Sequence, residues 1–304
     1  CLKNLLRTFF HINLKLTKKI FTYFYNPNEK WKISMTNDRN KMLVRWQKVS
    51  HNIPIINKND WIADPFFVKL KGKYFLLFEE YVWKEKKGII GCVEFFPSGN
   101  KESDIKFGKK ITLLKNEFHL SYPYTFYKNK KAYFIPENAS NGSWLYELNL
   151  ANKNAESELV AKPIKKLLNG RCIDPSYIGY EGYDYLFLTE MEDSKETMHL
   201  YFCKDLLNDK LIKHPNSPVC IDHTVSRGAG RIFIDDKKRL IRPTQIMKLK
   251  YGEGIAFSEI ELTPNSCHIR NIEEKIICDK NSQFKKIHHV DFLDEFTVID
   301  YLKK

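Results

Sequence analysis

The 304-residue chain lacks the short motifs that mark several common enzyme classes. It has no G-x-x-x-x-G-K-[ST] loop, no G-x-G-x-x-G between a strand and a helix, no H-E-x-x-H and no G-x-S-x-G. These absences argue against nucleotide-binding α/β folds, zinc peptidases and serine hydrolases. Gly228-Ala-Gly230 is too short to count as a dinucleotide fingerprint. We therefore expect no cofactor and no metal.

Paired cysteines are also missing. The seven cysteines show no spacing such as C-x-x-C, which argues against a zinc site and against a regular disulfide framework. This cysteine usage fits a reducing compartment best. We expect a cytoplasmic protein that is peripheral at the inner face of the membrane.

The N-terminus lacks both an uninterrupted apolar run and acidic residues. Residues 1–25 have apolar side chains spaced mainly three and four apart, interrupted by basic residues at positions 3, 7, 15, 18 and 19. The segment is too interrupted to span a bilayer and has no signal-peptide core. We expect residues 1–40 to form a basic amphipathic, helical unit. It either lies on an anionic membrane surface or packs against the rest of the protein.

The chain does contain an internal sequence repeat, called the echo below. W-I-A-D-P at 61–65, L-S-Y-P at 120–123 and C-I-D-P at 172–175 each precede an aromatic, strand-like run that ends in an acidic residue. Similar motifs recur at Gly230 and His289. The repeats are about 50 to 60 residues apart, a spacing that is typical of four-stranded propeller blades. We therefore predict an all-β, five-bladed β-propeller over residues 41–304, with blades starting near 61, 119, 171, 226 and 284.

The net charge of +13 suggests a nucleic-acid partner at first sight. Most of the surplus lies in the first 50 residues, so the propeller itself is only mildly basic. A solvated lysine surface explains this balance better, and we expect no nucleic-acid partner.

Two aspartates occupy equivalent positions in the echo. Asp64 and Asp174 each precede a proline, which biases its predecessor toward an extended conformation. Because the inner strands of a propeller line its central channel, these carboxylates should converge at the strand mouths. They are the first candidates for catalysis.

Glutamates recur at the end of the second strand-like run. Glu137 and Glu190 are catalytic candidates, and Glu79 and Glu80 are weaker ones. Glycosidic chemistry needs one protonated carboxyl to assist the leaving oxygen and one ionised carboxylate as base or nucleophile. Close carboxylates also push their pKa values apart. The alternative is that these acids hold turns and tie blades together.

Further polar and aromatic residues are candidates for binding substrate. An arginine fork can hold a carboxylate, a phosphate or sugar hydroxyls, and an aromatic ring can stack on a sugar face. The paired histidines suit hydrogen bonding or acid–base work better than metal binding, because a third ligand is missing. The alternative for all of them is packing or pairing between blades. The candidates are Arg227, Arg242, Gln245, Tyr122, Trp61 and His289.

The motifs together resemble a known family. Their order resembles that in the N-terminal propeller domain of plant glucosamine inositolphosphorylceramide transferases and their bacterial relatives in surface-polysaccharide loci. The motifs are W-x-A-D-P-F, F-E-E, H-L-S-Y-P, P-E-N, D-P-S, R-G-x-G-R, R-P-x-Q, Y-G and the terminal H-H-x-D…I-D. The resemblance covers roughly residues 46–301. It implies a five-bladed fold similar to arabinofuranosidase-like and invertase-like glycosidases. By that analogy Asp64 is the nucleophile or base, Asp174 orients or sets a pKa, and Glu190 or Glu137 donates the proton.

Three functional hypotheses follow. The first is an enzyme of glycan assembly, which transfers a sugar from a glycan or nucleotide-sugar substrate onto an acceptor at the membrane face. The second is a glycoside hydrolase that uses the same acids. The third is a non-catalytic, glycan-binding propeller that accompanies a partner transferase.

Overall fold

The computed structural model describes residues 29–36, 53, 60–97, 105–138, 142–153, 156–192, 195–248, 251–277 and 284–304. The basic segment at residues 1–25 therefore lies outside the described residues. Within them there is no helix long and apolar enough to cross a membrane.

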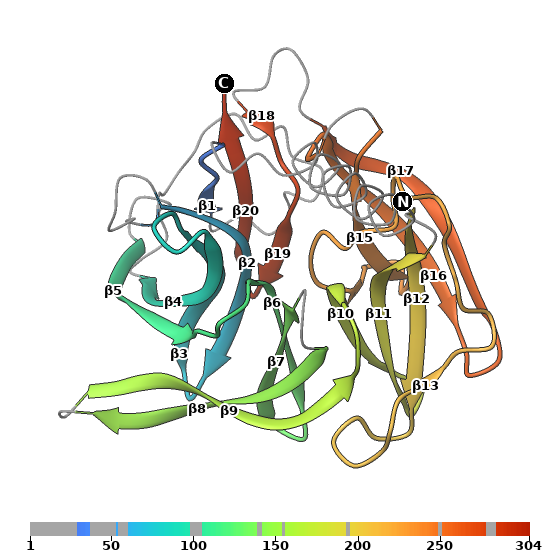
Figure 1. Ribbon diagram of the computed structural model, residues 1–304, viewed down its shortest axis with the longest axis horizontal. Helices are drawn as coiled ribbons and strands as arrows, with labels where there is room; N and C mark the ends of the chain where they lie inside the picture. Colours follow the sequence, from blue (N-terminus) through green and yellow to red (C-terminus); the bar gives the residue numbers. More distant parts are fainter. Residues whose placement is uncertain are drawn as a thin grey trace, which may run out of the picture.

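Five antiparallel sheets surround a central axis (Figure 1). This confirms the predicted all-β, five-bladed propeller, and the described residues contain no helix. The first sheet holds β2 (Trp61–Leu70), β3 (Lys73–Val82), β4 (Lys87–Pro97) and β5 (Ile105–Leu114). The second holds β6 (Leu120–Lys128), β7 (Lys131–Asn138), β8 (Ser143–Lys153) and β9 (Glu156–Leu168).

The third sheet holds β10 (Ile173–Tyr180), β11 (Tyr183–Glu192), β12 (Lys195–Cys203) and β13 (Ile212–Lys213). The fourth holds β14 (Phe233–Ile234), β15 (Leu240–Ile246), β16 (Gly254–Leu262) and β17 (Cys267–Ile277). The fifth combines β1 (Lys32–Thr36) with β18 (Phe284–Lys286), β19 (Val290–Leu293) and β20 (Phe296–Lys303).

The hydrophobic core fills the spaces between neighbouring sheets. Aromatic and aliphatic residues dominate the strands, and side chains of adjacent sheets form shared clusters. Phe66 of β2, Tyr124 of β6 and Leu186 of β11 belong to one such cluster. Each sheet therefore depends on its neighbours to bury its faces.

The ring is closed by strands from opposite parts of the chain. β1 pairs with β20 in an antiparallel register that joins Lys32 to Tyr301 and Thr36 to Thr297. The sequence analysis placed residues 32–36 in the separate unit 1–40, whereas the structure makes them a strand of the fifth sheet. Their alternating apolar residues, Ile33 and Met35, are buried against that sheet, which explains the difference.

A bulge interrupts the inner strand of each of the first three sheets at the echo. Asp64, Tyr122 and Asp174 have φ values of 51°, 44° and 46°, and the strand register shifts at each of them. The positive φ values differ from the extended conformation that we expect for a residue before proline. Buried carboxylates hold the strained backbone in place, because the amides of the three residues donate to Asp300, Asp64 and Glu137 respectively.

The fourth sheet has a glycine at the corresponding point. Gly230 has a φ of 142°, and a Cβ atom there would lie 1.8 Å from the carbonyl oxygen of Val290. We expect Gly230→Ala to lower the free energy of unfolding by more than about 2 kcal/mol, since both the backbone and the packing oppose the methyl group. Urea denaturation measures this, with Gly72→Ala as the control for positive φ in open space. Equal losses in the two variants would contradict the packing argument.

Candidate functional site

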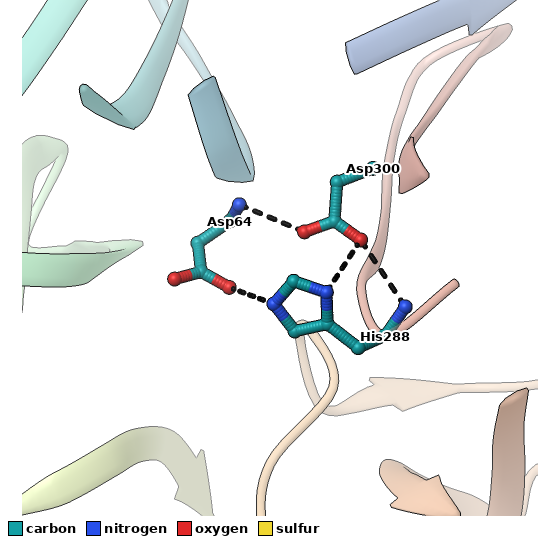
Figure 2. A group of neighbouring side chains, drawn as sticks. All are labelled: Asp64, His288 and Asp300. Carbon is teal, nitrogen blue, oxygen red and sulfur yellow. Dashed lines mark hydrogen bonds and ion pairs between the residues drawn. The ribbon is translucent and has the colours of Figure 1, made fainter. Parts of the chain in front are cut away.

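The first cluster of the candidate site joins the first and fifth sheets (Figure 2). The Nε2 atom of His288 lies 3.1 Å from Oδ1 of Asp64, and the Nδ1 atom lies 3.0 Å from Oδ1 of Asp300. Asp300 also accepts hydrogen bonds from the backbone amides of Asp64, His288 and His289 at 3.0 to 3.2 Å. One imidazole therefore bridges two buried carboxylates.

This arrangement moves the pKa values of the bridged groups in opposite directions. Burial lowers the pKa of His288, but the charge and contacts of Asp300 and Asp64 outweigh it and raise that pKa to about 10. Burial raises the pKa of Asp64, yet the hydrogen bond and charge of His288 bring it below its usual value. At neutral pH the pair is an imidazolium beside a carboxylate.

The same three residues have the spacing of a metal site. Their possible ligand atoms all lie within 4.8 Å of one another. A metal ion could bind there only by displacing the proton from His288, since a metal-binding imidazole must be neutral. We therefore interpret Asp64, His288 and Asp300 as an ion-pair triad.

The second cluster joins the second, third and fourth sheets. Arg227 donates from Nε and Nη2 to the two carboxylate oxygens of Asp174 at 2.7 and 3.2 Å. The Asp174 amide donates to Oε2 of Glu137 at 3.2 Å, and Nε2 of Gln245 lies 3.4 Å from Asp174. Four of the predicted site residues therefore meet here, with Asp174 held as a bidentate partner of arginine.

The pKa of Glu137 is displaced in the opposite direction to that of Asp64. Burial and the negative charge of Asp174 raise the pKa of Glu137 well above its usual value, and Arg227 offsets only part of this. Asp64 and Glu137 retain 6% and 7% of their surface exposed. The pKa values of the two acids are thus displaced in opposite directions, and such a displacement favours the division of roles that acid-assisted glycosidic chemistry requires.

Glu79 forms a related arrangement in the first sheet. Burial raises the pKa of Glu79, and the partly exposed His119 lowers it less than burial raises it. The Gly88 amide donates to Nδ1 of His119 at 2.9 Å, so Nε2 carries the proton and faces Oε1 of Glu79 at 3.2 Å. Glu80 faces a different partner, Lys110 of β5.

Glu190 is not in register with the other glutamates. Ala63 pairs with Glu79 and Ser121 pairs with Glu137, but Ile173 pairs with Thr189. Because side chains alternate along a strand, a one-residue offset turns Glu190 to the opposite face. There it accepts a hydrogen bond from Tyr201 at 2.7 Å.

Arg242 and Gln245 lie three residues apart on β15 and so face opposite ways. Gln245 donates to the Gly228 carbonyl at 2.9 Å within the second cluster. Arg242 instead points between the third and fourth sheets, where Nη2 donates to the Ser226 carbonyl at 3.3 Å. The structure therefore separates Arg242 from the other predicted substrate contacts.

The predicted stacking residues are packed inside the protein. Tyr122 is fully buried and crosses the axis, where its hydroxyl accepts from the Gly230 amide at 2.9 Å. Trp61 stacks on Tyr81 with a centroid distance of 4.8 Å. His289 is buried edge-on against Phe66. These three side chains are therefore part of the packed interior around the site and are not exposed for stacking on a sugar.

Sequence reasoning did not select four residues that the structure brings to the site. His288 and Asp300 stand in the terminal H-H-x-D…I-D motif, but the sequence did not show which histidine faces Asp64. Trp31 packs 4.1 Å from His288, and Tyr251 packs 5.0 Å from it, measured between ring centroids. The Y-G pair at 251–252 was a signal for the second of these, whereas Trp31 lay outside every repeat.

Comparisons with known proteins agree with this fold. Residues 48–292 match the family model described as glucosamine inositolphosphorylceramide transferase 1, N-terminal. The chain is 26% identical over 216 residues to the protein of that name from Oryza sativa subsp. japonica, covering 67% of this chain and 26% of the relative. It therefore spans about a quarter of the length of the relative it matches.

Two solved structures of glycoside hydrolases have a similar fold. The catalytic domain of the GH62 α-L-arabinofuranosidase of Coprinopsis cinerea superimposes with a TM-score of 0.56 at 11% identity, covering 88% of this chain and 84% of that one. A family 117 glycoside hydrolase of Zobellia galactanivorans gives 0.51 at 11% identity, covering 91% and 92%. The fold resemblance to arabinofuranosidase propellers is thereby confirmed, and the chain belongs to the family of the N-terminal domain of glucosamine inositolphosphorylceramide transferase 1.

Proposed function

We propose that this propeller is a carbohydrate-active enzyme of glycan or glycolipid assembly, in which Asp64 and Glu137 act on a sugar at the channel mouth. The observation that carries the proposal is the contrast between two buried carboxyl groups: Asp64 lies 3.1 Å from the imidazole of His288, whereas Glu137 is buried beside Asp174. These surroundings lower the pKa of Asp64 and raise that of Glu137. Family membership supports a sugar as the substrate.

The residues around each acid would serve distinct steps. The protonated carboxyl of Glu137 would donate its proton to the leaving oxygen of the donor sugar. The carboxylate of Asp64 would stabilise the positive charge that develops at the anomeric carbon, while His288 keeps Asp64 from taking up that proton. Arg227 would hold the carboxyl group of Asp174 in place through two hydrogen bonds, and Asp174 raises the pKa of Glu137.

The acceptor and the membrane location are inferred from sequence features. The basic residues at 1–25 would place the channel near an anionic lipid surface, where a lipid-linked acceptor is available. We also propose a partner transferase at the same surface.

The test is a mass-spectrometric turnover screen of the purified protein against nucleotide sugars and simple glycosides, with and without lipid-linked acceptors. We expect transfer, and a loss of about 100-fold or more in rate for Asp64→Asn and for Glu137→Gln. Glu190→Gln is the matched control and should retain activity, because its side chain faces Tyr201.

Each other outcome assigns a different function. Water as the acceptor in every productive reaction would mean a hydrolase. No turnover, with sugars still raising the melting temperature, would mean a binding module. Equal loss in all three variants would remove the roles proposed for Asp64 and Glu137.

A further inference from the structure

A cavity lies between the third and fourth sheets. It has a volume of about 160 Å³. Its walls come from β12, from the segment at residues 219–225 and from β15 to β17. None of the groups proposed for sugar chemistry lines it.

The polar wall of this cavity is a cross-strand row. Arg242 of β15 pairs with Ser258 of β16, and Ser258 pairs with Asn271 of β17. Directly opposed residues place their side chains on the same face of a sheet, and all three line the cavity. The Ser258 hydroxyl lies 2.8 Å from Oδ1 of Asn271, which orients the amide.

Arg242 is a buried cation without a carboxylate partner among the described residues. It is 1% exposed, and its Nε and Nη1 atoms have no hydrogen-bond partner within the part of the chain that the structure describes. Burial lowers the pKa of Arg242, but a guanidinium stays charged in proteins. An unpaired buried charge lowers the stability of the fold, so an anion bound to Arg242 would stabilise the protein.

Two other arginines of the same region show what this one lacks. Arg227 holds both oxygens of Asp174, and Arg231 holds both oxygens of Asp291. Planar guanidinium groups favour carboxylates because the two shapes match. The missing partner of Arg242 should therefore be a carboxylate.

The remaining walls limit the size and charge of this partner. Asp222 lies among the lining residues, and hydrogen bonds from Thr224 lower its pKa, so it stays ionised. A second negative charge on the ligand would be repelled. Met198, Val225 and Ile269 offer an apolar surface for an uncharged body.

We propose that this cavity binds a small organic monocarboxylate through Arg242. The proposal does not depend on the sugar chemistry of the channel. It predicts that the protein is stabilised by such acids at a site that Asp64→Asn leaves intact.

The test measures binding by isothermal titration calorimetry and melting temperature with acetate, propionate, butyrate and benzoate at constant ionic strength. Chloride and inorganic phosphate are the comparison anions. We expect at least one monocarboxylate to bind and to raise the melting temperature more than either comparison anion. Arg242→Met should weaken that binding about tenfold or more, since it removes charge-assisted hydrogen bonds. Its ligand-free melting temperature should stay level or rise, because an unpaired charge is gone.

Arg239→Met is the matched arginine control, since Arg239 pairs with Asp235 on the surface, and it should keep the full response. If Arg242→Met does not fold, Val225→Trp fills the cavity without changing the guanidinium and should abolish binding. A response to phosphate alone, a response that survives both Arg242→Met and Val225→Trp, or no response to any carboxylate would overturn the proposal.

Discussion

Replacing Asp291 by alanine is expected to lower the free energy of unfolding by about 3–5 kcal/mol, the usual cost of removing one partner from a buried ion pair. Asp291 of β19 is fully buried and accepts from Nε and Nη2 of Arg231, both at 2.9 Å. It also accepts from the amide of Phe67 at 2.8 Å. Without this carboxylate the guanidinium of Arg231 would remain in the core without its counter-ion.

The cost is large because Arg231 connects four sheets. Besides Asp291 of the fifth sheet, it donates to the carbonyl of Thr125 in the second sheet at 2.6 Å. It also donates to the carbonyl of Phe67 in the first sheet at 2.9 Å, while its own backbone precedes β14 of the fourth. Loss of the carboxylate therefore weakens several contacts between sheets at once.

Equilibrium urea denaturation measures this effect. Asp294→Ala is the control, because Asp294 pairs with Lys69 at the surface and should cost less than about 1 kcal/mol. The double variant Arg231→Met, Asp291→Leu should recover part of the stability, since it removes both charges. A loss below about 1 kcal/mol in Asp291→Ala would show that Arg231 does not depend on this partner.

Raising the pH is expected to destabilise the wild-type protein through His288. The folded protein keeps the imidazole protonated up to a pKa of about 10, against the ordinary value of 6.5 for the unfolded chain. A raised pKa stabilises the fold fully below pH 6.5, and this contribution is lost progressively as the pH rises toward 10. At 1.36 kcal/mol per pH unit, about 3 kcal/mol should be lost between pH 6.5 and 9.

The measurement is the free energy of unfolding at several pH values for the wild type and for His288→Gln. The glutamine variant should be less stable at pH 6.5 and should show a flatter pH dependence, because it has no proton to lose. Using the difference between the two proteins removes the titration of other groups near the triad, such as His289 and Tyr251. Parallel pH curves would show that His288 is not the protonated bridge.

The fold could be predicted from the sequence because each blade contains a local motif, and these motifs recur at a regular spacing. The equivalence of Asp64 and Asp174 could be predicted for the same reason, since both bulges have the same local sequence, an aspartate followed by a proline. The position of Glu190 was not visible, because a one-residue offset in strand pairing reverses the face of a side chain without altering composition.

Long-range contacts were also beyond the sequence pattern. Arg242 and Gln245 look like neighbours in R-P-x-Q, but their faces are set by pairing with β16. His288 and Asp300 acquire their roles only when the fifth sheet lies beside β2, which brings together residues more than 200 positions apart. Local propensity carries no information on such a contact.

The closure of the ring by β1 has a consequence for how the chain reaches its native state. β1 is made well before its partner β20, because the two strands lie at opposite ends of the described chain. Non-local pairing of this kind slows folding, and until it forms both strand edges remain open to other chains. Nascent molecules of this protein should therefore be most prone to aggregate between the synthesis of β1 and that of β20, and a chaperone that shields β1 during this interval would protect them.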